Sequence, residues 1–429
     1  MNFVFEEVST HKNFINNWEM NGVGSDRFTV SPLFNRMNVL RFIIKDFNSN
    51  IEIFHINDRP KNYIISVGVH NDPHWWAGGE FSSNDRVVSL FEFLNDIYLN
   101  DLIYGGAYLL IDSSLEGYHE DWVFNFFHKE CERRNIPANK IIYITGNSIV
   151  EHRYENWLKE NPKEFKMNPL PYSHFENDVY LTSKQMLEKN DLPTFEEQII
   201  YKENNLNDIK LFNNLNKKPR EHRIWFYSKL FYNDLLNKGL VSMNQIPVSN
   251  RRYCNVFMDE KYVEEFAKTL PSLIYNVSNE IEDTGFYINR VNYKVCDDSW
   301  ISVISEARFE DEEGTVFLSE KVFKPIASHH PFIVMGNKHS LRELKKLGYK
   351  TFSNWIDESY DELDNLERMD AIIKVLKDID KIENKIEWFK SMEDVLKFNY
   401  RILKRNVTKL YPYAFNKIIP ILGDTIRLI

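Results

Sequence analysis

The chain has 429 residues, of which 43% are hydrophobic and 14% aromatic, with a net charge of −10 and a pI near 5.7. Its length predicts two domains of about 200 residues each rather than one core. The hydrophobic content excludes a disordered chain, and the acidic balance argues against affinity that depends mainly on nucleic-acid phosphates.

The cysteines and the hydropathy pattern indicate a compartment. Cys131, Cys254 and Cys296 are scattered and form no CxxC pair, which fits a reducing environment and gives no zinc-site spacing. The start, MNFVFEEVST, lacks the regions of a signal peptide, and no run of about 18 apolar residues occurs. We therefore expect a cytoplasmic protein without a membrane span. Its richness in Asn, Lys, Ile and Tyr fits a phage, in which case the compartment is the host cytoplasm, or a low-GC bacterium.

In the first part of the chain, residues 1–200, apolar runs alternate with amphipathic segments. The runs predict strands over 39–45, 51–56, 63–69, 107–111 and 140–144, and the amphipathic segments predict helices over 85–99, 120–134 and 151–160. This alternation is typical of an α/β domain with a parallel sheet. Residues 161–193 predict a less regular connection, and 202–207 are a polar run. We place the domain boundary near residues 195–208.

The loop after the strand at 63–69 has the composition of a binding loop. Residues 70–80, HNDPHWWAGGE, combine polar, aromatic and glycine residues at the end of a strand, where binding groups tend to lie. Trp75 and Trp76 suit stacking on a sugar or a base. The alternative is a hydrophobic plug between domains.

Two carboxylates follow the strand at 107–111. Asp112 comes directly after it, and Glu116 lies a few residues later beside Gly117, which frees the backbone there. Both are candidates for proton transfer at a strand end. The alternatives are that Asp112 caps the next helix and that Glu116 is a surface residue.

Residues 208–385 predict a second α/β domain, followed by terminal helices over 386–429. Its strands are predicted over 208–213, 300–305 and 332–335. Its helices are predicted to end at Asn237 and to span 317–327, 371–379 and 382–403, with mixed helix over 407–429. The polar loop before the helix at 317–327 makes 300–336 a strand-loop-helix-strand unit of a parallel sheet.

Charged residues gather at the strand ends of this second domain. The helix at 317–327 has Ser319 as its cap and opens with Glu320 and Lys321. Ligands of open α/β sheets bind beyond the carboxyl ends of the strands, and helix N-termini favour anions. A lysine there suits a phosphate, and a glutamate suits a sugar hydroxyl. A basic cluster follows the strand at 208–213: Lys217, Lys218, Arg220 and Arg223. For each residue alone, a solvated surface position is the alternative.

These residues carry a resemblance to a known family. The sequence Ser319-Glu320-Lys321, then KPIA at 324–327 and PFIVMG at 331–336, resembles the donor-binding signature of α1,3-fucosyltransferase-type glycosyltransferases. It is still more similar to glycosyltransferase-like proteins of tailed phages, whose pattern continues as LGYKTF at 347–352 and DESYD at 357–361. The basic segment NKKPREHR at 216–223 matches that pattern too. The resemblance covers the C-terminal half well and the N-terminal half in patches.

The resemblance implies the α/β GT-B architecture, two Rossmann-like domains that face each other across a cleft, with helices 386–429 able to return to the first domain. It implies an inverting, metal-independent glycosyltransferase that moves a hexosyl or pentosyl group from a nucleoside-diphosphate sugar to a hydroxyl acceptor. A UDP-sugar or GDP-sugar would be the co-substrate, with no further cofactor. The Asp-x-Asp at 378–380, the pattern that holds a metal in A-type enzymes, lies in a helical charge pattern and indicates a solvated face.

On this hypothesis the candidate residues take roles. Donor binding falls to Lys217, Arg220, Arg223, Glu306, Glu320 and Lys321, where Glu306 either binds the sugar or positions Lys321. Acceptor binding falls to His70, Asp72, Trp75 and Trp76. The general base is Glu116, then Asp112, with Asp72 and Glu80 behind them.

The acceptor is open. A hydroxymethylated or hydroxylated base in phage DNA is one candidate, and it would have to be flipped or reached in a groove. A glycan, a protein side chain and a small molecule are others. Two further hypotheses are a non-catalytic nucleotide-sugar-binding protein and a DNA-binding structural protein.

Overall fold

The computed structural model describes residues 2–5, 28–29, 52–69, 89–114, 117, 121–188, 192–216, 220–242, 293–309 and 314–406. They form two compact units. The first takes Met1–His174 and, from much later in the chain, Glu313–Phe317; the second takes the described residues of Phe175–Glu312 and those from Leu318 onward. The division at residue 174 lies before the sequence-based boundary at 195–208, because the residues in between form two helices of the second unit.

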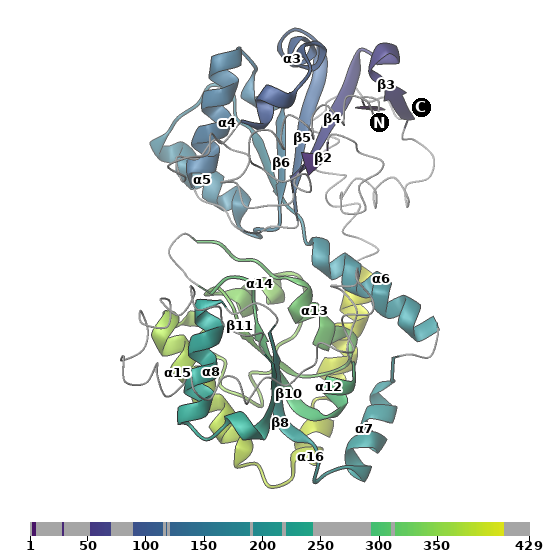
Figure 1. The fold of residues 1–429 in the computed structure, drawn as a ribbon, viewed down its shortest axis with the longest axis vertical. Coiled ribbons are helices and arrows are strands. Elements are labelled where there is room, and N and C mark those ends of the chain that lie inside the picture. Colours follow the sequence, from purple (N-terminus) through teal and green to yellow (C-terminus); the bar gives the residue numbers. More distant parts are fainter. Residues whose placement is uncertain are drawn as a thin grey trace. The chain divides into compact units, whose positions relative to one another are not determined.

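The first unit contains a mostly parallel sheet with the strand order β3-β1-β4-β5-β6-β7 (Figure 1). A short strand, β2, pairs with β4 in the antiparallel sense. The strands are β1 (Asn2–Phe5), β2 (Phe28–Thr29), β3 (Glu52–His55), β4 (Asn62–Val69), β5 (Gly106–Ser113), β6 (Ile141–Thr145) and β7 (Asn168–Pro171). The central strands β4 to β6 are almost wholly buried, as expected of parallel strands covered on both faces.

Helices pack on this sheet through aromatic side chains. They are η1 (Ile56–Asp58), η3 (Leu90–Phe93), α3 (Asp96–Ile103), α4 (Asp121–Arg134), η4 (Ala138–Lys140) and α5 (Val150–Glu160). Phe127 of α4 contacts Tyr143 of β6 at 5.2 Å between ring centroids, and Phe124 contacts Tyr154 of α5 at 4.9 Å. These contacts belong to one buried core that joins the helices to the sheet.

Two predictions for the first half are wrong. The single helix expected over 85–99 is interrupted, because Ser89 caps η3 and Asn95 caps α3, so each side chain starts a new turn. The irregular connection expected over 161–193 instead contains β7 and the helix α6 (His174–Glu188). The strand predicted over 39–45 lies outside the described residues.

The second unit has a fully parallel sheet in the order β11-β10-β8-β9. Its strands are β8 (Lys210–Leu215), β9 (Gly239–Ser242), β10 (Ser299–Ser305) and β11 (Phe332–Met335). The helices α8 (Glu221–Tyr232) and α15 (Asn365–Asp380) lie on one side of it, and α12 (Tyr293–Asp297) and α13 (Glu320–Ala327) on the other (Figure 1). The remaining elements are α7 (Phe195–Asn204), η5 (Leu236–Lys238), α14 (Ser340–Lys346), η9 (Ser359–Glu362), α16 (Lys385–Lys390) and a helix over 393–406.

The predicted α/β class with two parallel, Rossmann-like sheets is confirmed. In the second sheet the chain winds from β8 to β9 in one direction, and β10 and β11 follow on the opposite side of β8. The strands β8 and β10 therefore form a topological switch point. Open α/β sheets bind ligands beyond the carboxyl ends of the strands at such a point.

The helix predicted over 317–327 begins at Glu320 instead, and residues 314–317, shortly before it, belong to the first unit. There Asn147 forms a β-bridge with Phe317, and its Oδ1 accepts a hydrogen bond from the Val316 amide at 3.2 Å. The Phe317 ring covers two glycines. A Cβ at Gly146 would lie 2.6 Å from a ring atom, and one at Gly117 would lie 2.2 Å away, so only glycine leaves room for this ring.

The last predicted helix, 382–403, is also divided. It ends as α16 at Lys390 and resumes at 393, after a turn at Ser391 and Met392. The described part of the resumed helix packs within the second unit, where Asn399 and the backbone of Lys350 exchange hydrogen bonds. Residues 407–429 lie outside the described residues. No helix in the described part of the chain is both long and apolar enough to span a bilayer.

The polar run at 202–207 begins with a buried residue, Lys202. Its side chain is fully buried at the end of α7, and Nζ donates to the carbonyls of Cys296, Asp297 and Ser299 at 2.6–2.8 Å. The ammonium thus satisfies backbone acceptors at the end of α12 and the start of β10, while the rings of Trp300 and Phe389 pack against it.

We predict that Lys202→Met lowers the free energy of unfolding by about 3 kcal/mol, because methionine keeps the packing but leaves buried carbonyls without a donor. Urea denaturation checks this. The control is Lys210→Met at an exposed position of β8, which should change stability by less than about 0.5 kcal/mol. Equal effects of the two substitutions would contradict the assignment.

Candidate functional site

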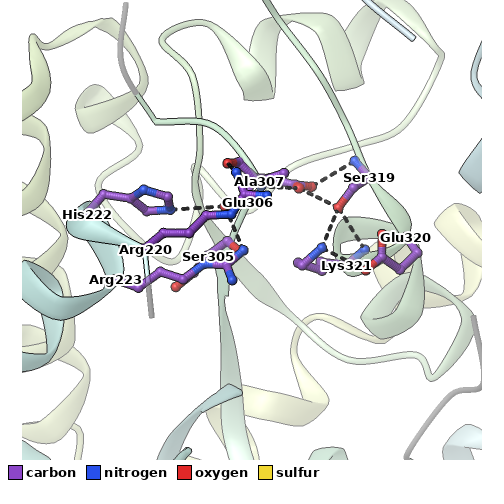
Figure 2. A network of polar contacts seen from close by, with 9 residues as sticks. All are labelled: Arg220, His222, Arg223, Ser305, Glu306, Ala307, Ser319, Glu320 and Lys321. Carbon is purple, nitrogen blue, oxygen red and sulfur yellow. Dashed lines mark hydrogen bonds and ion pairs between the residues drawn. The ribbon is translucent and has the colours of Figure 1, made fainter. Parts of the chain in front are cut away.

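The turn that follows β10 is surrounded by basic side chains (Figure 2). Its backbone carbonyls accept hydrogen bonds from the start of α8: Ala307 O from Arg220 Nη1 at 2.6 Å, and Glu306 O from Arg223 Nη2 at 3.1 Å. Arg223 Nη2 also reaches Ser305 O at 3.1 Å. Because carbonyls are neutral, these bonds fix the guanidinium groups without cancelling their charge.

His222 completes this side of the turn. Its Nε2 lies 3.1 Å from Glu306 O, and its ring stacks on Phe309 with centroids 5.6 Å apart. Burial, together with the charge of Arg223, lowers the pKa of His222 to about 3, so the imidazole is neutral at pH 7. Since a carbonyl only accepts, the proton of the neutral ring resides on Nε2.

The two arginines differ in burial. Arg223 is 5% exposed, and burial together with Arg220 lowers its pKa to about 10, which leaves it charged at pH 7. Arg220, the residue before α8, is partly exposed. Cations at the start of a helix oppose its dipole, so this arrangement carries a local cost that an anionic ligand would relieve.

Glu306 faces the start of α13 rather than an open site. Its Oε1 accepts from the Ser319 amide at 2.9 Å, and its Oε2 accepts from the Ser319 hydroxyl and from the Ala307 amide at 3.2 Å. The carboxyl is fully buried, and this burial raises its pKa. Every oxygen of Glu306 is thus engaged in holding the N-cap of α13, which suits positioning better than sugar binding.

Glu320 and Lys321 form the first turn of α13. Lys321 Nζ lies 2.7 Å from Glu320 Oε1 and 3.1 Å from Ser319 Oγ, and it remains partly exposed. Burial acts to raise the pKa of Glu320, but the charges of Lys321 and Lys324 outweigh it and lower that pKa. Glu320 is therefore ionised at neutral pH and can accept hydroxyl hydrogen bonds.

The cluster as a whole is positive. It brings together the cations Arg220, Arg223 and Lys321, the carboxylates Glu306 and Glu320, and a neutral His222. All lie around the carboxyl end of β10 at the switch point (Figure 2). A positive, partly buried cluster of this kind attracts phosphate groups.

Sequence reasoning missed Arg368, which holds the same turn from the other side. Its side chain is fully buried, and Nη1 donates to Phe309 O at 3.1 Å and to Gly336 O at 2.6 Å. Its Nε donates to Leu363 O, and its guanidinium lies 5.0 Å from the centre of the Phe309 ring. One arginine in an amphipathic helix gives no sequence signal of this role, because its usual place is the surface.

The DESYD motif at 357–361 is structural. Glu358 accepts from the Thr351 hydroxyl and the Phe352 amide of the LGYKTF motif, and the Tyr360 hydroxyl accepts from the Val334 amide of β11 at 3.2 Å. Asp361 accepts from two amides at the start of α14. These residues shape the scaffold around β11.

The remaining candidates are scattered. Asp112 is the next-to-last residue of β5 and is buried, and its Oδ1 accepts from the Ser114 amide at 3.1 Å. Asp378 and Asp380 of α15 pair with Lys381 and Lys238. Within the described ranges no group of three or more His, Cys, Asp or Glu residues could hold a metal. Six predicted site residues lie outside those ranges: His70, Asp72, Trp75, Trp76, Glu116 and Lys217; Glu80 and Lys218 do as well.

We predict that His222→Gln makes the protein less sensitive to acid. In the folded wild type the pKa of His222 is about 3, which lies below the value of 6.5 in the unfolded chain. The unfolded state therefore binds the proton first, and the free energy of unfolding decreases as the pH falls from 6.5 towards 3. Gln keeps an N–H donor but does not titrate. Urea denaturation between pH 6 and 4 should show a slope lower by up to about 1.4 kcal/mol per pH unit. Exposed His152→Gln should leave the slope unchanged; a matching change there would contradict the prediction.

Comparisons with known proteins identify no family. No family model matches the chain, and no curated protein matches it. Three solved structures are remotely similar. An α,α-trehalose 6-phosphate synthase from Burkholderia multivorans has a TM-score of 0.42 and 9% identity over 86% of this chain and 72% of that chain. An α,α-trehalose-phosphate synthase (UDP-forming) from Burkholderia vietnamiensis has a TM-score of 0.39 and 8% identity, over 75% of this chain and 69% of that chain. The N-terminal domain of Candida albicans trehalose-6-phosphate phosphatase has a TM-score of 0.38 and 12% identity, over 77% of this chain and 68% of that chain. The fold assignment rests on the two parallel sheets themselves.

Proposed function

We propose that this protein is a glycosyltransferase that transfers a sugar from a nucleoside-diphosphate sugar to a hydroxyl acceptor. The observation that carries the proposal is the positive cluster at the β8/β10 switch point, where Arg220 and Lys321 are partly exposed and held by short hydrogen bonds. The resemblance of Ser319-Glu320-Lys321 and its surroundings to glycosyltransferase donor motifs supports the same reading.

The cluster suits the chemistry of the leaving group. When the glycosidic bond to the diphosphate breaks, negative charge grows on the phosphate oxygens, and cations already in place stabilise it without reorganisation. In this proposal Arg220 and Lys321 contact the diphosphate. Arg223 and Glu306 are positioning residues in this proposal. Arg223 is buried and donates hydrogen bonds to backbone carbonyls, and the carboxylate of Glu306 accepts hydrogen bonds from Ser319.

Glu320 is the proposed hydroxyl acceptor of the donor site. One carboxylate oxygen pairs with Lys321, and the ionised group has further lone pairs for a ribose or sugar hydroxyl. Lys217 joins the diphosphate contacts on sequence grounds alone.

The acceptor side rests on the sequence. An inverting transfer needs a general base on the acceptor hydroxyl, and Glu116 is the proposed base. Asp112 is second, since its carboxylate already receives an amide hydrogen bond at the end of β5. The donor reaction is proposed to be metal-independent, with His70, Asp72, Trp75 and Trp76 binding the acceptor, which is a hydroxylated DNA base, a glycan or a small molecule.

We predict that one nucleoside diphosphate from the panel UDP, GDP, ADP and dTDP binds the wild type in calorimetric titration without added metal. Lys321→Ala should weaken that binding at least tenfold, because it removes a charge-assisted contact worth about 1.5–3 kcal/mol. The control is Lys381→Ala, at a lysine that pairs with Asp378 at the end of α15; it should bind as the wild type does.

Two outcomes separate the competing hypotheses. Binding of no nucleotide, combined with salt-dependent affinity for DNA, would overturn the proposal in favour of a DNA-binding protein. Nucleotide binding with no release of diphosphate from the corresponding nucleotide sugar, across acceptors of all three classes, would indicate a non-catalytic binding protein.

A further inference from the structure

A chain of side-chain amides runs along the carboxyl end of β8. Asn214 Nδ2 donates to Val303 O at 2.7 Å and to Ser305 Oγ at 2.8 Å. The next link is Asn216, whose Nδ2 donates to Asn214 Oδ1 at 2.7 Å. Both asparagines are buried.

The orientation of both amides follows from the first link. The Val303 carbonyl can only accept, so the atom of Asn214 that faces it must be the nitrogen. Asn214 therefore turns its Oδ1 towards Asn216. Because this oxygen can only accept, the side-chain atom of Asn216 that bonds to it must be the donor Nδ2. The far end of the chain is consequently the Asn216 oxygen, which can only accept.

That last oxygen has no donor among the described residues. Asn216 Oδ1 is buried, and no N–H or O–H group in the described part of the chain reaches it. A buried acceptor without a partner costs about 1–3 kcal/mol. The backbone at this position is fixed, because the backbone N–H of Asn216 donates to Ser242 O of β9 at 2.9 Å.

The place of this oxygen in the fold gives it meaning. Asn216 directly follows β8, and β8 pairs with β10 so that Asn213 lies opposite Ser302. Continuing this register by three residues puts Asn216 level with Ser305, the residue whose carbonyl Arg223 binds. Asn216 thus lies at the switch point, level with the residue of β10 whose carbonyl Arg223 binds.

We propose that Asn216 is a ligand-binding residue of the donor site, whose Oδ1 accepts a hydrogen bond from a hydroxyl or N–H group of the nucleotide sugar. The inference rests on the proposed function. The positive side chains recognise the phosphates, and Asn216 recognises a neutral donor group beside them. Because the oxygen is buried in the unliganded chain, binding includes rearrangement of the side chains that cover it.

Asn214 then acts as a positioning residue. Its bond to Val303 O prevents its amide from turning over, and its Oδ1 in turn holds the nitrogen of Asn216 inward. Without Asn214 the Asn216 amide could turn and offer a donor to the ligand instead of an acceptor. The two residues should therefore contribute to binding as one unit.

The experiment is isothermal calorimetry of Asn216→Ala with two pairs of probes, UDP with UDP-glucose and GDP with GDP-mannose. We expect about a three- to tenfold loss of affinity, the value of one hydrogen bond to a neutral acceptor. A loss with the free diphosphate assigns the bond to the ribose or base. A loss confined to the nucleotide sugar assigns it to the transferred sugar.

The control is Asn205→Ala, which removes an asparagine whose Nδ2 also donates to a backbone carbonyl but which lies before β8; it should bind like the wild type. Asn214→Ala should weaken binding as much as Asn216→Ala, and the double variant no more than either. If Asn214→Ala fails to fold, Asn216→Ala and its control still decide.

Wild-type affinity of Asn216→Ala for a nucleotide that the wild type binds would overturn this inference alone, and would leave an ordered water as the partner of Oδ1. Failure of the wild type to bind any of the four probes, and also ADP and dTDP, would instead overturn the donor-site proposal on which the inference rests.

Discussion

The second unit depends on hydrogen bonds from cationic side chains to backbone carbonyls. From the last residue of β10 to the fourth residue after it, the carbonyls of Ser305, Glu306, Ala307 and Phe309 accept hydrogen bonds from arginine side chains, two of which come from α8 and its cap and the third from α15. A turn with its carbonyls exposed would otherwise need water. Since the partners are neutral, the arginines keep their charge, and the same bonds that order the turn create a positive field at the sheet edge.

Lys202 obeys the same rule at the opposite end of β10. Its ammonium binds three carbonyls where α12 gives way to the strand, so both ends of the central strand are fixed by cations bound to backbone oxygens. Neither residue type is expected in a core, and each is tolerated because its hydrogen bonds to backbone carbonyls offset the burial of the charge.

The strands were predicted well because apolar, β-branched runs bounded by polar residues fit the buried strands of a parallel sheet. The strand at 332–335 is an example, and the helix at 120–134 was likewise predicted from its amphipathic pattern. It failed where one side chain redirects the backbone, as Ser89 and Asn95 do, and where a polar residue is buried, as with Lys202 and Arg368. The proposed donor pair, Glu320 and Lys321, could be singled out from local sequence. The amide chain of Asn214 and Asn216 could not, because its hydrogen bonds join strands that are distant in sequence.

The placement of Phe317 bears on how the protein is made. Beyond Met1–His174, the described residues of the first unit include the short segment that ends at Phe317. During synthesis, a nascent chain can form the first sheet early. The apolar seat, that is, the surface at Gly117 and Gly146 against which the Phe317 ring packs, stays uncovered until that phenylalanine has left the ribosome. The N-terminal unit therefore matures only after most of the second unit has been translated, and a fragment that stops near residue 174 would carry an exposed apolar seat prone to aggregation.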